Sequence, residues 1–196
     1  MIEGNIDFEF PNKYNVIKFD DTPFYRQYFN QLPYAKGIDF LAMNSSEIIF
    51  LEVKDFRGRE ANTKWKVRLN KHKYGTNYER MDSLDIEIAE KVAMTLACLA
   101  GATTKRHLQN QLTAGQTILS MLMQNNLPSL RIILFLEGNF ESHSKTQKMV
   151  MTAIKKSIQK KLAWLNCKVE VENLATQTGK YFSAEHIDRP MVVKQN

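Results

Sequence analysis

Two short apolar segments joined by a polar turn are the feature that most restricts how this chain can fold. Residues 37–43 (GIDFLAM) and 47–54 (EIIFLEVK) are rich in aliphatic and aromatic side chains, and residues 44–46 (NSS) separate them. Apolar runs of this length bounded by turn residues predict the two strands of a β-hairpin. Side chains two positions apart on a strand point to the same face, so Glu52 and Lys54 project together from the second strand.

The remaining patterns predict further helices and strands. Residues 21–23 (DTP) indicate a helix start, because a capping side chain precedes a proline, and this helix ends before Pro33. Residues 64–69 (KWKVRL) alternate polar with apolar side chains, as a third, half-exposed strand would. The other expected elements are an irregular or extended lead-in at 5–19, helices at 82–100, 112–125 and 146–165, strands at 130–136 and 168–171, and an irregular tail.

This order of elements predicts an α/β fold in which helices flank one mixed central β-sheet. Residues 130–136 (LRIILFL) are continuously apolar and partly β-branched, which is typical of a central strand that is buried on both faces. No repeat, low-complexity stretch or linker divides the 196 residues. We therefore expect a single domain that spans residues 1–196.

Composition restricts the class of partner and the compartment. The 27 Lys and Arg residues exceed the 21 Asp and Glu residues, and the resulting net charge of +6 suits a polyanion such as nucleic acid. Cys98 and Cys167 have no Cys or His at metal-ligand spacing, which indicates core thiols in a reducing compartment. The sequence shows no signal-peptide pattern, and no apolar run approaches the ~20 residues of a membrane span. We expect a cytoplasmic protein without membrane contact.

Asp39, Glu52 and Lys54 are the residues best suited to chemistry. Charged side chains that emerge from an apolar strand need a partner, a metal ion or solvent. Carboxylates are ligands that Mg²⁺ prefers, and a lysine beside them can stabilise negative charge that develops on a phosphate. The residues alone also allow the plainer interpretation of a surface ion pair at a strand edge, with Asp39 as an acid near a turn.

The pattern Asp39…Glu52-Val53-Lys54 on a predicted hairpin resembles the signature of the PD-(D/E)XK nucleases, which have the restriction-endonuclease-like fold. The predicted order of helix, three-strand meander, helix and strand over residues 20–136 is also similar to the core of this superfamily. Ile38 stands where the motif of the superfamily has Pro, a position that shapes the backbone and carries no chemistry.

The resemblance implies a divalent-metal-dependent nuclease that hydrolyses phosphodiester bonds, with DNA as the expected substrate. Asp39, Glu52 and the Val53 carbonyl would bind Mg²⁺, for which Mn²⁺ can substitute, and Lys54 would orient the attacking water or stabilise the transition state. A catalytically inactive nucleic-acid-binding or protein-interaction module with the same fold is the alternative. A homodimer or a complex with a partner protein is compatible with either function.

Several further residues have two open roles each. Members of the superfamily often add an acid from the first helix; Asp20 and Asp21 are the nearby acids, and Asp21 is either that acid or the helix cap. Glu87 and Lys91 are either a solvated i,i+4 pair or polar residues near the metal. The candidate phosphate contacts, which are otherwise ordinary solvated charges, are Arg57, Lys71, Lys73, Lys155 and Lys156.

Overall fold

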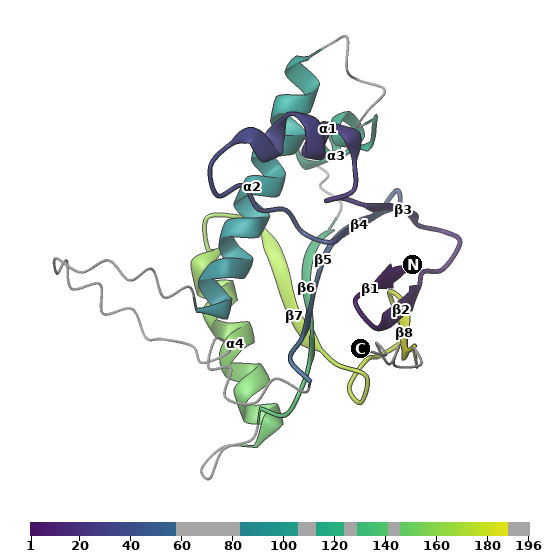
Figure 1. Ribbon diagram of the computed structural model, residues 1–196, viewed down its shortest axis with the longest axis vertical. Helices are drawn as coiled ribbons and strands as arrows, with labels where there is room; N and C mark the ends of the chain where they lie inside the picture. Colours follow the sequence, from purple (N-terminus) through teal and green to yellow (C-terminus); the bar gives the residue numbers. More distant parts are fainter. Residues whose placement is uncertain (58–82, 106–112, 124–128, 141–145, 188–196) are drawn as a thin grey trace, which may run out of the picture.

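The computed structural model describes residues 1–57, 83–105, 113–123, 129–140 and 146–187. Within these ranges, a five-stranded mixed sheet and a separate three-stranded sheet are flanked by helices (Figure 1). The predicted α/β class with a mixed sheet is therefore confirmed. The strand predicted at residues 64–69 lies outside the described residues.

The predicted hairpin lies within the five-stranded sheet, whose order is β3-β4-β5-β6-β7. β4 (Phe40–Met43) pairs antiparallel with β5 (Glu47–Asp55), and the Asn44 side chain accepts hydrogen bonds from two backbone amides of the turn. The first strand is shorter than predicted, since residues 37–39 precede it. β3 (Asn15–Lys18) pairs antiparallel with β4, so the extended alternative for the lead-in is correct at this segment.

The other half of the sheet is parallel. β6 (Ser129–Glu137) lies between β5 and β7 (Cys167–Glu172) and runs parallel to both. In the sequence, α2 (Leu84–Thr104) and α3 (Thr113–Met123) connect β5 to β6, and α4 (Gln147–Lys161) connects β6 to β7. Connections between parallel strands of one sheet are right-handed. The connections from β5 to β6 and from β6 to β7 both lead to the next strand in the same direction across the sheet. They therefore place their helices on the same face.

The two faces of the sheet are buried by different elements (Figure 1). On β6, Leu130, Ile132, Leu134 and Leu136 belong to the core beneath the helices, whereas Ile133 and Phe135 belong to the core on the opposite face. Alternating side chains thus enter two cores, which confirms the prediction of a central strand buried on both faces.

A small antiparallel sheet of β1 (Ile2–Glu3), β2 (Ile6–Glu9) and β8 (Ser183–His186) covers the face opposite the helices. The Phe8 ring of β2 packs against Phe135 of β6 and against Phe182, with ring centroids 5.1 Å and 5.4 Å away. The prediction of an irregular tail is wrong at β8, because this segment pairs with β2 and its apolar flank fills the second core.

The helices begin near their predicted starts, but two of them are shorter than expected. α1 (Pro23–Gln27) is followed by a separate 3-10 turn at Phe29–Gln31, so the helix predicted to reach Pro33 is divided. α4 follows Thr146, whose side chain accepts a hydrogen bond from an amide of the first turn, and it ends at Lys161. In the described part of the chain, no helix has both the length and the apolar character needed to cross a membrane.

Candidate active site

Asp39 and Glu52 lie side by side at the open end of the β4–β5 hairpin. Phe40 pairs with Leu51 in the antiparallel ladder, so Asp39 and Glu52 are the next two residues to face each other. The Val53 amide donates a hydrogen bond of 2.7 Å to Asp39 Oδ2, which holds the Asp39 carboxylate against β5. Both acids are buried, with 7% of Asp39 and 1% of Glu52 exposed. The structure therefore brings together the two acids that the hairpin pattern predicted as neighbours.

Lys54 lies on the same face of β5 as Glu52, and two side chains of α2 meet them there. Lys54 Nζ is 3.0 Å from Glu52 Oε1 and 2.7 Å from Glu87 Oε1. Lys91 Nζ is 2.5 Å from Glu52 Oε1 and 3.7 Å from Asp39 Oδ1. Residues four apart on a helix share a face, so α2 presents Glu87 and Lys91 together to β5. Glu87 and Lys91 therefore face β5 and are not a solvated pair, whereas their role near a metal stays a prediction.

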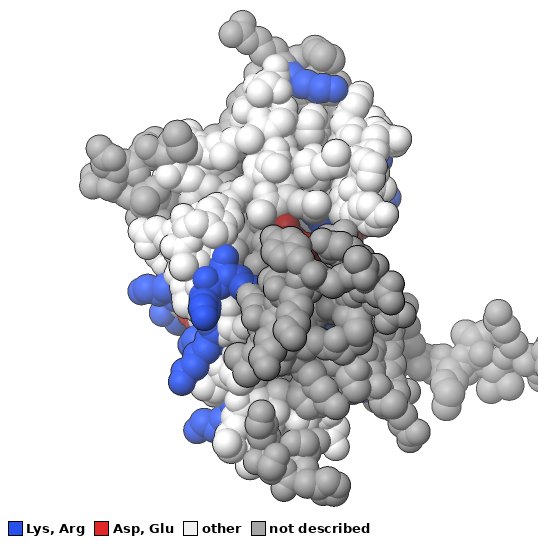
Figure 2. Space-filling view, turned by 90° about the vertical axis from the view of Figure 1, so that its left-hand side faces the viewer, with Lys and Arg blue, Asp and Glu red and all other residues white. Residues whose placement is uncertain are grey.

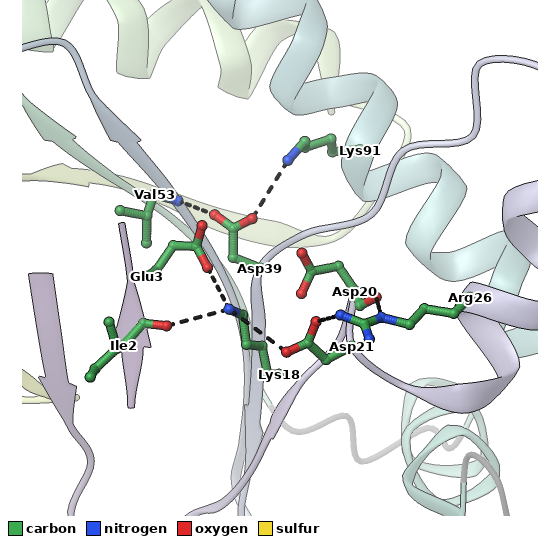
Figure 3. Close-up of polar contacts among 9 residues, drawn as sticks. All are labelled: Ile2, Glu3, Lys18, Asp20, Asp21, Arg26, Asp39, Val53 and Lys91. Carbon is green, nitrogen blue, oxygen red and sulfur yellow. Dashed lines mark hydrogen bonds and ion pairs between the residues drawn. The ribbon is translucent and has the colours of Figure 1, made fainter. Parts of the chain in front are cut away.

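Of the two acids predicted near the start of α1, Asp20 is the one that faces the site and Asp21 is not. Figure 3 shows the Asp20 carboxylate turned toward Asp39, whereas Asp21 points to Arg26. Thr22 occupies the cap position of α1, so the interpretation of Asp21 as the helix cap is wrong. Asp21 instead forms an exposed ion pair with Arg26, which explains why it does not face the buried acids.

The position of Asp20 depends on β3, which the sequence indicated only as part of an extended lead-in. The amide of Phe19, directly after β3, donates a hydrogen bond of 2.8 Å to the Asp39 carbonyl. This bond continues the pairing of the two segments up to the site, and Asp20 follows immediately. Recognition of residues 15–18 as a strand paired with residues 40–43 was the signal needed to find it.

Three acids of the site, Asp20, Asp39 and Glu52, have raised pKa values. Burial, followed by the charge of Asp39, raises the pKa of Glu52 to about 7 despite two neighbouring lysines. Burial and the same Asp39 charge raise the pKa of Asp20 to about 6. Burial also raises the pKa of Asp39, although Lys91 and the Val53 amide oppose this effect. Without a metal, these carboxyls bind protons more tightly in the folded than in the unfolded state. Their contribution to stability therefore decreases as the pH rises from about 4 toward 7.

Two carboxylate oxygens of the site have the chemistry of ligands for a hard cation. Glu52 Oε2 and Asp20 Oδ1 are buried and accept no hydrogen bond from the residues that the structure describes. Such an oxygen is costly to bury unless a donor or a cation satisfies it. When the carboxyls of Asp20, Asp39, Glu52 and Glu87 are all ionised, they carry four negative charges, and Lys54 and Lys91 carry two positive charges. One divalent ion would balance the remaining two negative charges. Among the described residues, no three His, Cys, Asp or Glu side chains converge on one point, and Lys91 bridges Asp39 and Glu52 instead.

The expected phosphate contacts are dispersed over the molecule. Arg57 follows β5 and donates from Nε to Asp55 Oδ1 at 2.8 Å, so its charge is paired with the acid at the end of the strand. Lys155 and Lys156 are exposed on α4, and Figure 2 shows Lys and Arg side chains gathered on this side of the molecule. The two remaining candidates lie outside the described residues: Lys71 and Lys73.

The fold and the site together define an α/β protein with a cluster of buried acids and lysines at the end of a hairpin. Over residues 22–185 the chain matches the model of a family described as a family of unknown function (DUF6661), and it belongs to this family. The matched range contains the hairpin and the part of α2 that faces it. No curated protein and no solved structure matches the chain.

Proposed function

We propose that this protein is a divalent-metal-dependent nuclease of the PD-(D/E)XK type, which hydrolyses phosphodiester bonds in DNA. The observation that carries the proposal is the buried pair of Asp39 and Glu52 with Lys54 on the same face. Buried acids with raised pKa values lower the stability of a metal-free protein near neutral pH, and such groups concentrate at functional sites. The net charge of +6 suits DNA as the substrate.

Asp39 Oδ1 and Glu52 Oε2 are the oxygens best placed to be metal ligands. Asp39 Oδ2 already accepts a hydrogen bond from the Val53 amide, and within the described ranges Glu52 Oε2 accepts none. The N–H and C=O of one strand residue point to the same side, so the Val53 carbonyl opens toward Asp39 and would be a third ligand. Mg²⁺ or Mn²⁺ bound there supplies a Lewis acid that activates water and neutralises charge on the phosphate.

Lys54 is the group that would act on the attacking water or on the phosphate. Burial lowers its pKa, but the charges of Glu52 and Glu87 and their hydrogen bonds outweigh burial, and the net pKa is well above that of an ordinary lysine. The side chain is therefore an ammonium across the neutral range. It donates hydrogen bonds and positive charge in the transition state, and it does not act as a general base.

A non-catalytic module with the same fold is the second candidate, and Lys91 is the observation that favours it. The Lys91 ammonium contacts Glu52 and lies near Asp39, so it neutralises part of the acid cluster without a metal. A module without a metal needs such a bridge between its buried acids. In a nuclease, by contrast, the cation competes with Lys91 for the same carboxylates.

Replacement of Lys91 by methionine separates the two candidates. We expect Lys91→Met to bind Mn²⁺ about tenfold more tightly than the wild type, because a unit charge about 4 Å away is worth about 1–4 kcal/mol. The metal-free variant should also unfold at a lower temperature, since Glu52 loses the shorter of its two ion pairs and keeps only the one with Lys54. Isothermal titration calorimetry measures the affinity, and thermal melts with EDTA or Mn²⁺ measure the stability.

Lys36→Met is the matched control for this experiment. Lys36 Nζ pairs with Glu90 Oε2 at 3.1 Å, so this variant also removes a lysine that pairs with an acid of α2. Its Mn²⁺ affinity should change much less than that of Lys91→Met, because the charge of Lys36 acts on Glu87, whereas Lys91 contacts Glu52 directly. Absence of Mn²⁺ binding in both the wild type and Lys91→Met would contradict the nuclease proposal and favour the non-catalytic module.

A further inference from the structure

A groove between α4 and the end of β7 is separate from the acid cluster. Its volume is about 510 Å³, within the range of pockets that hold small ligands. One wall is a stripe of α4 that includes Lys148, Met151 and Lys155, and the other wall includes Val171 of β7 and Ala175. Positions 148, 151 and 155 lie on one face of a helix, so these α4 side chains line the groove together.

The walls of the groove combine positive charge with an apolar surface. Lys148 and Lys155 are exposed and are separated by about 10 Å along the helix axis, at 1.5 Å per residue. Met151, Val171 and Ala175 form the apolar surface between them. The lining residues that the structure describes include no Asp or Glu. The groove therefore suits an anion that also has a flat apolar part.

The groove lies on the same face of the sheet as the candidate active site. Val171 of β7 pairs with Leu134 of β6, which pairs with Glu52 of β5, so the three residues form one row across the sheet. Val171 packs against the core beneath the helices, and Glu52 faces α2 on that side. Two strand spacings separate Val171 from Glu52, or about 10 Å. The groove and the acid cluster are therefore neighbours on one face of the sheet.

We propose that this groove binds one unpaired nucleotide of a nucleic-acid strand. The base lies on the surface of Met151, Val171 and Ala175, and the flanking phosphates contact Lys148 and Lys155. A base in a duplex is stacked and paired, so only a single-stranded segment can place a base in the groove. A peptide whose side chains are all acidic would use the lysines but not the apolar surface. The inference rests on the proposed function for the identity of the ligand, and it narrows that function to substrates with an unpaired segment.

The structure also distinguishes Lys155 from Lys156, which the sequence analysis predicted together as candidate phosphate contacts. Lys155 lines the groove, whereas Lys156, the next residue, is not among the residues that line it. Successive residues on a helix are about 100° apart, so only one of the two can face β7. Of these two lysines, we assign the phosphate contact to Lys155.

The test measures binding of a fluorescein-labelled oligothymidylate by anisotropy, in EDTA, over a series of salt concentrations. Lys148→Ala and Lys155→Ala should each weaken binding and reduce the slope of log Kd against log salt by about 0.7, the value for one phosphate contact on a single strand. Lys160→Ala is the control, because Lys160 is an exposed lysine of α4 that does not line the groove. Its affinity and slope should match those of the wild type.

Three outcomes would overturn the inference. The first is absence of oligonucleotide binding by the wild type or unchanged slopes in both groove variants. The second is a blunt duplex that binds as tightly as the single strand with the same dependence on Lys155. The third is a polyglutamate peptide that competes as well as the oligonucleotide at equal charge. Because EDTA prevents metal-dependent cleavage, a reduced slope without any nuclease activity would support the groove and contradict only the proposed function.

Discussion

Replacing Lys54 by alanine is expected to reduce Mg²⁺-dependent cleavage of DNA by about 100-fold or more. The Lys54 ammonium is fixed between Glu52 and Glu87, on the face of β5 that Glu52 also occupies. Its loss removes stabilisation that is needed mainly in the transition state, so the rate constant decreases more than the affinity for DNA. Cleavage of plasmid, linear and branched DNA, with Mg²⁺ or Mn²⁺, measures this effect.

Two further variants make this experiment decisive. Glu52→Gln keeps the volume of the side chain but removes the charge of a metal ligand, so it should abolish cleavage as well. Lys36→Ala removes a lysine that pairs with Glu90 on α2, and it should cleave at the wild-type rate. Circular dichroism melts identify any variant that has lost its fold. Equal cleavage by the wild type, Lys54→Ala and Glu52→Gln would show that this site does not catalyse the reaction.

Asp85→Ala is expected to lower the free energy of unfolding by about 3 kcal/mol or more. Asp85 is fully buried in the first turn of α2, and its carboxylate accepts bonds of 2.5 Å from Ser83 Oγ, Ser157 Oγ and Lys161 Nζ. Burial alone would raise the pKa of Asp85, but bonds from Lys161, Ser157 and Ser83 lower it below its usual value. The charged form therefore stabilises the protein above the unfolded pKa of 3.8, and this contribution is lost as the pH falls through the folded pKa.

The hydrogen bonds of Asp85 join α2 to α4. Because α2 also carries Glu87 and Lys91, which face the candidate site, loss of Asp85 is expected to affect the geometry of that site as well. Chemical denaturation at pH 7 measures the change in free energy. Lys160→Ala, at an exposed position of α4, should change it by about 0.5 kcal/mol or less. A loss below about 1 kcal/mol for Asp85→Ala would mean that the buried pair contributes no more than an exposed one.

The sequence predicts the hairpin and β6 well because their patterns are local. An apolar run bounded by turn residues defines each strand, and the register of one hairpin places Asp39 beside Glu52. The class of the fold follows from the order of such elements. Each of these patterns can be recognised within one segment, although the pairing of β6 with β5 and β7 joins segments that are distant in the sequence.

Features that depend on distant contacts could not be predicted in the same way. β8 is a strand because it pairs with β2 from the other end of the chain, and Asp20 reaches the site because β3 pairs with β4. Spacing alone also left the orientation of Lys91 open, since an i,i+4 pair faces either solvent or a strand. The packing of α2 against the sheet determines which face is buried, and periodicity does not show what lies opposite that face.

Crystals soaked in Mn²⁺ and measured for anomalous scattering provide the most direct test of a metal site at the hairpin. We predict an anomalous peak within coordination distance of Asp39 Oδ1 and Glu52 Oε2, with Lys91 Nζ moved from its position 2.5 Å from Glu52 Oε1. A map without a peak at these two acids, in which Lys91 still contacts Glu52, would contradict a metal-dependent nuclease.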